Sequence, residues 1–224
     1  MNVRAYVAEF IGTFALIFVG VGAIASAHAG GGLVTVALAH GFTIAVMVSA
    51  TAAVSGGHLN PAVTIGALVG RKIDVKNGVG YIVSQCLGAI VAALLVKTAV
   101  PSQWLADVAM GTPALADGVT ISQGLIMEAV LTFFLVFVVF GTGIDPRAPK
   151  CGGLFIGLTV ALDIMIGGPI TGAAMNPARH LGPALVGSCE AVGQIWLYWV
   201  GPVIGGIVAA LVYTNVLEDK SAGS

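Results

Sequence analysis

The tripeptide Asn-Pro-Ala occurs twice in this chain, at Asn60-Pro61-Ala62 and at Asn176-Pro177-Ala178. Asparagine is a preferred helix N-cap and proline is favoured at the first helical position, so each tripeptide predicts the start of a helix. The amide oxygen of a capping asparagine accepts backbone N–H groups, and its NH₂ group stays able to donate to a passing oxygen atom. One such motif alone is best explained as a structural cap, but the pair favours a site that contacts a polar solute.

Three carboxylates lie within long apolar stretches, at Glu9, Glu128 and Asp163. A carboxylate inside a membrane is costly and needs partners. Glu9 and Glu128 occupy matching positions of an internal repeat, so we expect both to brace the loops before the two motifs by accepting backbone N–H groups. A proton relay for coupled transport is the alternative. Asp163 has no acidic counterpart, and we expect it to anchor the loop at 170–175 or the long outer loop rather than to line a pore.

The composition indicates that these groups belong to a membrane protein. Of 224 residues 58% are hydrophobic and 8% are charged, with a mean hydropathy of +1.02, whereas ordinary soluble domains carry about 25% charged residues. Soluble enzymes, secreted disulfide scaffolds, disordered tails and nucleic-acid-binding proteins are therefore disfavoured, and the net charge of −1 gives no sign of a nucleic-acid partner. Cys86, Cys151 and Cys189 lack metal-site spacing, so we expect no metal and no cofactor.

Six stretches are long and apolar enough to span a bilayer, which takes about 20 residues. They are 5–27, 34–53, 78–98, 121–143, 152–169 and 192–216. The first is longer than the core of a secretory signal. Basic residues favour the cytoplasmic side of membrane proteins. With both termini cytoplasmic, only Lys97 among the basic residues near the ends of the spans lies outside, against seven inside: Arg4, Arg71, Lys72, Lys76, Arg147, Lys150 and Lys220.

The chain also repeats itself. The segments around Glu9 and Glu128, the two Asn-Pro-Ala motifs, and Ile90–Leu94 with Ile207–Leu211 match in the same order, at offsets of 119, 116 and 117 residues. Each half holds three spans, so the halves must have opposite orientations in the membrane, as in many transport folds. We predict one channel domain over residues 1–224, with repeat halves of about 1–98 and 121–216 joined by an outer loop at 99–120.

The apolar segments 54–70 and 170–187 are too short to span. Each leaves room for about ten helical residues after its motif, or roughly 15 Å. We expect two re-entrant half-helices, entering from opposite faces, whose N-termini meet near the midplane. Their dipoles would repel cations there, while the asparagine amides would force a file of water to reorient and so hinder proton hopping. The predicted fold class is therefore all-α: six transmembrane helices and two re-entrant half-helices in an inverted 3+3 repeat.

At this point the sequence resembles the aquaporin, or major intrinsic protein, family. The resemblance covers essentially the whole chain and depends on the doubled Asn-Pro-Ala motif with Arg179 after the second copy. It implies a passive channel rather than an enzyme, with water and small neutral solutes as its partners in the bilayer. It also implies one pore per subunit and a homotetramer.

The family's selectivity filter falls here on His40, Ile164, Ala173 and Arg179. This set is similar to that of the tonoplast intrinsic subgroup, whose members include channels for ammonia, urea or hydrogen peroxide. We expect Arg179 to be held by carbonyls of its own loop. A histidine that bonds between helices without reaching the lumen is the alternative at His40.

Two features favour water over glycerol. Glycerol facilitators of the family typically carry Asp where this chain has His180, and they lack the aromatic pair Tyr198-Trp199. His180 itself is expected to bridge loop backbone. We expect His58 to brace the first re-entrant loop and His28 to lie solvated in an outer loop.

A secondary transporter is the rival hypothesis, because such proteins also use inverted repeats and broken helices. A coupled carrier would normally place an ionisable pair at the midplane, where this chain has neutral amides. An intramembrane enzyme is weaker, since neither a Ser/His pair on one face nor two-histidine metal spacing occurs. The short tails, Met1–Arg4 and Glu218–Ser224, favour a prokaryotic inner membrane over a plant vacuole.

Overall fold

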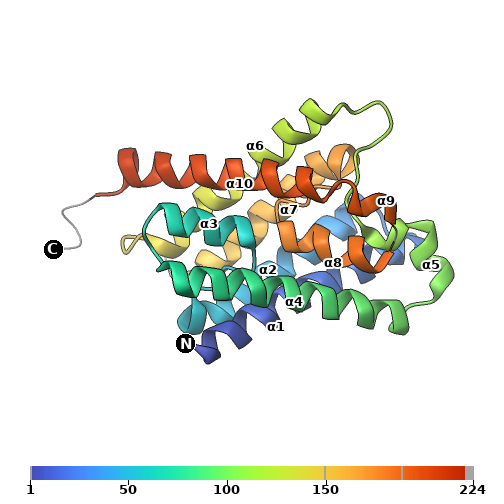
Figure 1. The fold of residues 1–224 in the computed structure, drawn as a ribbon, viewed down its shortest axis with the longest axis horizontal. Helices are drawn as coiled ribbons and strands as arrows, with labels where there is room; N and C mark the ends of the chain where they lie inside the picture. The colour runs from blue at the N-terminus through green and yellow to red at the C-terminus, as the bar shows by residue number, and fades with distance from the viewer. Residues whose placement is uncertain (1, 149, 188, 220–224) are drawn as a thin grey trace.

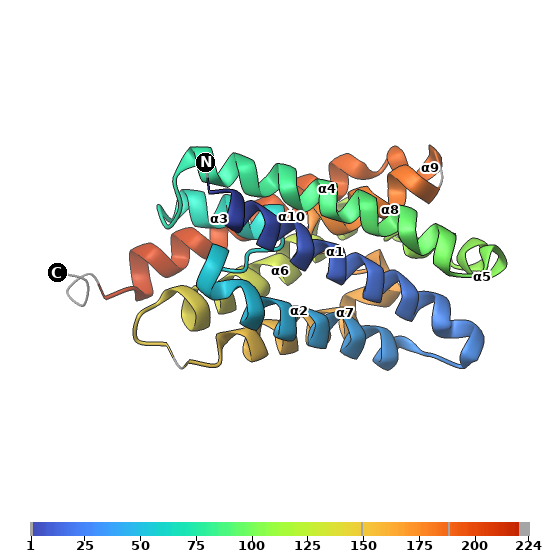
Figure 2. The same ribbon diagram turned by 90° about the horizontal axis from the view of Figure 1, so that it is seen from below.

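The computed structural model describes residues 2–148, 150–187 and 189–219, and its regular elements in these ranges are all helical. Six helices in these ranges are long and apolar enough to cross a membrane, which confirms the predicted fold class. They are α1 (Val3–Ala25), α2 (Leu33–Ser55), α4 (Val75–Ala99), α6 (Ile121–Val139), α7 (Gly152–Thr171) and α10 (Ile195–Val212). The six form an elongated bundle (Figures 1 and 2).

Two short helices interrupt the series after α2 and after α7. These are α3 (Pro61–Val69), of nine residues, and α8 (Pro177–Gly187), of eleven. Figures 1 and 2 show α3 toward the end of the bundle where the chain begins and α8 toward the opposite end. Both preceding helices stop at a glycine with positive φ, Gly56 at 87° and Gly172 at 78°. Glycine adopts this left-handed conformation without steric cost, so each span can end and turn inward.

The connections hold more helix than the sequence predicted. The expected outer loop at 99–120 contains α5 (Ser102–Asp107) and the turn η2 (Ala109–Gly111). Another turn, η1 (Ser26–Ala29), follows α1, and α9 (Cys189–Val192) precedes α10, so the last span starts three residues later than predicted. These elements are too short to leave a periodic apolar pattern, which is why composition alone missed them.

The spans approach one another closely where glycines face backbone. A Cβ atom added to Gly157 on α7 would lie 2.2 Å from the carbonyl oxygen of Gly41 on α2. A similar contact lies within each half of the chain. In the first half Gly88 on α4 faces Phe10 O on α1, and in the second half Gly205 on α10 faces Ala129 O on α6. In lipid the association of helices depends on such close packing, because the apolar solvent gives no hydrophobic drive.

The first span begins and the last span ends at the same end of the bundle (Figures 1 and 2). There α6 continues as the π-helical turn η3 (Phe140–Ile144), and α10 as η4 (Tyr213–Leu217). Arg147 donates to Asp145 and to the carbonyl of Leu217, and Tyr213 also donates to Asp145. The Arg147 guanidinium holds the pKa of Asp145 well below its usual range. This charged cluster ties the loop after α6 to the end of the last span.

The close contact between Gly157 on α7 and Gly41 on α2 gives a direct test of the helix packing. In Gly157→Val the new side chain would overlap the backbone of α2, and overpacking typically costs about 1–3 kcal/mol. We expect a lower thermal midpoint and less monodisperse protein in detergent, measured by fluorescence-detected size exclusion. The matched control is Gly22→Val on α1, where a Cβ atom meets nothing within 4 Å. Equal stability of the two variants would contradict this packing.

Candidate functional site

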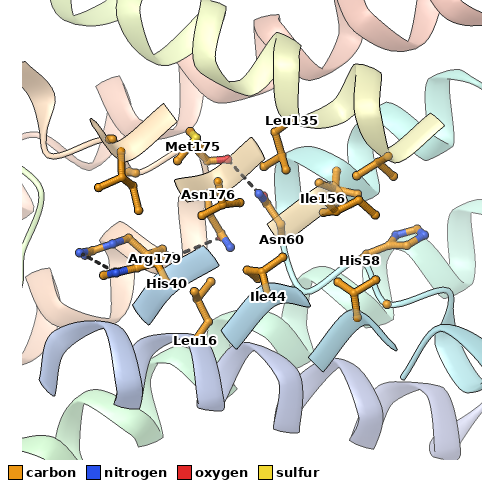
Figure 3. Close-up of a pocket in the computed structure, with 18 residues that line it drawn as sticks. Leu16, His40, Ile44, His58, Asn60, Leu135, Ile156, Met175, Asn176 and Arg179 are labelled. Carbon is orange, nitrogen blue, oxygen red and sulfur yellow. Dashed lines mark hydrogen bonds between the residues drawn. The ribbon is translucent and has the colours of Figure 1, made fainter. Parts of the chain in front are cut away.

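The two motif asparagines meet where α3 and α8 begin. Asn60 Oδ1 accepts the N–H of Ala62 at 2.8 Å, and Asn176 Oδ1 accepts that of Ala178 at 3.0 Å. Their amide nitrogens cross to the other half: Asn60 Nδ2 donates to Met175 O and Asn176 Nδ2 to Leu59 O, both at 2.9 Å. Figure 3 shows the two side chains next to each other within one cavity. Each NH₂ group keeps a second N–H for another acceptor.

The residues that accept these bonds are strained. Leu59 and Met175 have φ values of 52° and 51°, which are uncommon for residues other than glycine. Such conformations cost about 1–3 kcal/mol each and persist only where the surroundings impose them. Here the strain turns each carbonyl toward the asparagine of the other half.

Buried carboxylates impose this conformation. Glu9 accepts the N–H groups of His58 at 2.9 Å and Leu59 at 2.6 Å. Glu128 accepts those of Ala174 at 3.0 Å and Met175 at 2.8 Å. Neither carboxylate has any exposed surface. The loop N–H groups therefore take the place of water around each carboxylate, and the carboxylate takes the place of water for those N–H groups.

Hydroxyl groups complete the two clamps in the same way. Ser55 donates to Glu9, and Thr171 donates to Glu128. Tyr81 and Tyr198 donate to the carbonyls of these same residues, Ser55 and Thr171. Among the described residues, the first half alone adds an amide, Gln85 Nε2, which donates to Glu9 Oε2 at 2.7 Å. No motif in the sequence points to Gln85, although it is a buried polar residue inside a span.

Three cavities adjoin one another along the bundle. The central one, of about 30 Å³, contains both motif asparagines and has room for only a few water molecules. A second cavity, of about 250 Å³, lies toward the end of the bundle away from the termini, and we name it the outer cavity for the orientation predicted from the sequence; it shares His40, Ile164 and Arg179 with the central one. A third cavity, of about 640 Å³, lies toward the termini and shares His58 and other residues with the central one. Neighbouring cavities share lining residues, so the three lie in series along the bundle, and we call this series the path.

Apolar side chains make up much of the rest of the wall of the central cavity. Leu16, Ile44, Leu135 and Ile156 line the central cavity (Figure 3). A solute in this cavity therefore meets a few polar groups among mostly apolar side chains. This arrangement orients a small polar molecule without holding it tightly.

The four predicted filter residues all line the central cavity, and Arg179 is 4% exposed. Arg179 Nη1 donates to Gly111 O at 2.8 Å, and Nη2 lies 3.5 Å from His40 Nε2. The expectation that carbonyls of its own loop hold Arg179 was wrong for this contact, because Gly111 belongs to η2, in the connection between α4 and α6. Nothing in the local sequence pairs positions 68 residues apart.

His40 has a defined tautomer in this arrangement. Its Nδ1 lies 2.8 Å from the carbonyl oxygen of Val36, and since a carbonyl can only accept, Nδ1 carries the proton. Nε2 then presents its lone pair toward Arg179. Gly20 makes room for this ring, because a Cβ atom there would lie 2.4 Å from His40 Nε2. No sequence pattern distinguishes Gly20, because its role depends on how α1 packs against α2.

The other predicted polar residues take different places. His58 lines the path and contacts Thr64 Oγ1 at 3.1 Å. His180 is fully buried and stacks on Tyr198, with ring centroids 4.1 Å apart. Asp163 Oδ2 makes no hydrogen bond within the described part of the chain, so no contact of that oxygen supports the predicted anchor. The side chains of His28 and Cys189, and all of Lys220, lie outside the described residues.

Comparisons with known proteins agree with this geometry. The sequence model of the family described as major intrinsic protein matches residues 1–213, and the chain belongs to this family. Probable aquaporin TIP3-2 of Arabidopsis thaliana is 47% identical, with 96% of this chain and 84% of that protein covered. Aquaporin TIP4-4 of Zea mays is also 47% identical, covering 96% and 86%. The crystal structure of the aquaglyceroporin from Plasmodium falciparum superposes with a TM-score of 0.87, at 26% identity over 97% of each chain.

The chain is therefore a multi-pass membrane channel and not an enzyme. The family membership also removes the support for a secondary transporter. The prokaryotic inner membrane that was predicted from the short tails has no support, because the TIP relatives are plant proteins.

The clamp on the second loop can be tested by removing its acceptor. Glu128→Ala would leave the N–H groups of Ala174 and Met175 unpaired inside the membrane, and each buried donor without a partner costs about 1–3 kcal/mol. We expect a sharp fall in folded yield, measured by size exclusion in detergent. Glu128→Gln keeps one acceptor oxygen, so its folded yield should lie between those of Glu128→Ala and the wild type. Wild-type yield and thermal midpoint in Glu128→Ala would contradict the clamp.

Proposed function

We propose that this chain conducts water passively and excludes ions and protons, with the path between α3 and α8 as its pore. The crossed pair of asparagine amides in a cavity of about 30 Å³ is the observation that carries this proposal. A solute there must pass in single file and must exchange bulk water for two amide donors.

Charge excludes cations at two levels. The N-termini of α3 and α8 point toward the asparagines, and each carries a partial positive charge of roughly half an elementary charge. Arg179 adds a full charge where the central and outer cavities meet. A cation on this path would lose its hydration shell and meet the positive ends of two helices and a guanidinium.

Proton exclusion follows from the same amides. A water molecule that accepts from Asn60 or Asn176 points its own hydrogens away from the centre, so the file reverses orientation there. Hopping along a hydrogen-bonded file requires continuous orientation, and this reversal interrupts it. Glu9 and Glu128 support this view, because their oxygens are engaged by the loops.

We propose His40, Ile164, Ala173 and Arg179 as the selectivity filter. His40 and Arg179 give one polar side, whereas Ile164 offers no hydrogen-bond donor or acceptor and Ala173 is small. Water should pass readily, with ammonia, urea and hydrogen peroxide as further candidate solutes. Glycerol should pass poorly, because the imidazole occupies space beside the guanidinium.

The orientation and the assembly belong to the same proposal. The seven-to-one distribution of basic residues favours cytoplasmic termini. A homotetramer with one pore in each subunit is the assembly that family membership suggests.

Stopped-flow light scattering on proteoliposomes tests the channel. A pore predicts fast osmotic shrinkage with a low activation energy, unchanged by sodium or proton gradients. Simultaneous pH-sensitive dye measurements should show no faster dissipation of a proton gradient than in empty vesicles. Water flux that depends on an ion gradient would overturn the proposal.

The filter assignment has its own test. His40→Ala removes the ring beside Arg179, so we expect urea or glycerol flux to rise by about tenfold, or about 1.4 kcal/mol of barrier, and water flux to change much less. The control is Thr43→Ala on the same helix, whose hydroxyl donates to Ala39 O and does not line the described path. An unchanged ratio of solute to water flux in His40→Ala would show that the assigned register is wrong.

A further inference from the structure

A fourth cavity, of about 430 Å³, lies apart from the conducting path. It forms where the ends of α4 and α8 meet α5 and η2, at the end of the bundle away from the termini. Lys97 and Ser102 are polar members of its lining, and Leu105, Met110 and Val186 are apolar ones. None of the described residues that line the conducting cavities lines this one.

The charged side chain in the described lining of this cavity is the cation Lys97. Lys97 Nζ donates to the carbonyl of Val186 at 3.0 Å, and an ammonium group has further N–H donors to offer. No described lining residue is acidic. The nearby carboxylate, Asp107 on α5, accepts from Gln103 at 2.8 Å and is not part of the described lining. The chemistry therefore suits an anion that also contacts a hydroxyl.

The position of the cavity identifies the source of that anion. Lys97 is the third residue from the end of the α4 span, where hydrocarbon gives way to headgroups. Leu94, one turn earlier, is 50% exposed, as is Leu185 on α8. Trp104 on α5 is 39% exposed, and tryptophan is enriched at this depth of a bilayer. An apolar surface thus adjoins the basic cavity, as an acyl chain below a headgroup would require.

We propose that this cavity binds the phosphate headgroup of an acidic phospholipid from the leaflet opposite the termini. The phosphate accepts from Lys97 and Ser102, and the acyl chains lie over Leu94 and Leu185. The proposal depends on the fold and on charge, and not on which solute the pore conducts.

Occupancy of this cavity also bears on the filter. Ala109 and Met110 have φ values of 47° and 59°, and they lead into Gly111, whose carbonyl accepts from Arg179. Met110 also packs against Gly187 at the end of α8, where a Cβ atom would lie 2.9 Å from the methionine Cβ. A lipid seated against Met110 therefore braces the strained turn that positions Arg179.

Binding can be measured without any flux assay. The full chain is reconstituted in nanodiscs of phosphatidylcholine, alone or mixed with phosphatidylglycerol, and the retained lipid is identified by native mass spectrometry. We expect phosphatidylglycerol to be retained and to raise the thermal midpoint. Lys97→Gln should weaken this retention about fivefold, or about 1 kcal/mol. The control is Lys76→Gln, which removes a charge near the opposite end of the same helix.

A second variant keeps the charge and removes the space. Ala106→Trp fills the cavity while Lys97 stays, so it should also lose retention. Equal phosphatidylglycerol retention in Lys97→Gln, Lys76→Gln and the wild type would overturn the proposal, as would full retention in Ala106→Trp. If soluble glycerol phosphate in pure phosphatidylcholine raised the midpoint equally, the site would bind a free anion and the lipid assignment would be wrong.

Discussion

The hydrogen bonds from two loop segments to Glu9 and Glu128 are the interaction on which the rest of this structure depends. Backbone that is not helical can exist at membrane depth only if its polar groups are satisfied. Each carboxylate accepts two successive N–H groups and so holds Leu59 or Met175 in a left-handed conformation. The carbonyls that this conformation presents are the ones to which Asn60 and Asn176 donate. Without the clamps, neither half-helix would have a fixed starting point.

The two halves share this clamp but differ in what they add to it. With the offset of 116 residues between the motifs, Arg179 corresponds to Val63 and His180 to Thr64. The first half thus presents an aliphatic side chain where the second presents a guanidinium. The described contacts of Arg179 lead to Gly111 and His40, at the end of the path away from the termini. Duplication explains the symmetric centre, and divergence at a few positions explains why the proposed filter lies on one side only.

Local signals were enough to predict much of this arrangement. Long apolar runs defined the six spans, and an asparagine followed by proline marked the start of α3 and of α8. The contacts of Glu9 and Glu128 could be anticipated because a carboxylate in lipid must find partners. Contacts that depend on packing between distant segments could not be predicted. Gly111 binds Arg179 through its backbone, and Gly20 matters because it has no side chain, so neither leaves a chemical signature in the sequence.

The central claim is that the clamped loops present both asparagine amides to a file of water. An experimental structure in lipid, at a resolution that shows ordered water, would test it most directly. The account predicts water oxygens at about 2.9 Å, the usual N–H···O distance, from Nδ2 of both Asn60 and Asn176, within a continuous file that runs past His40 and Arg179. An amide turned toward lipid, or a centre sealed by side chains with no ordered water beside either asparagine, would contradict the account.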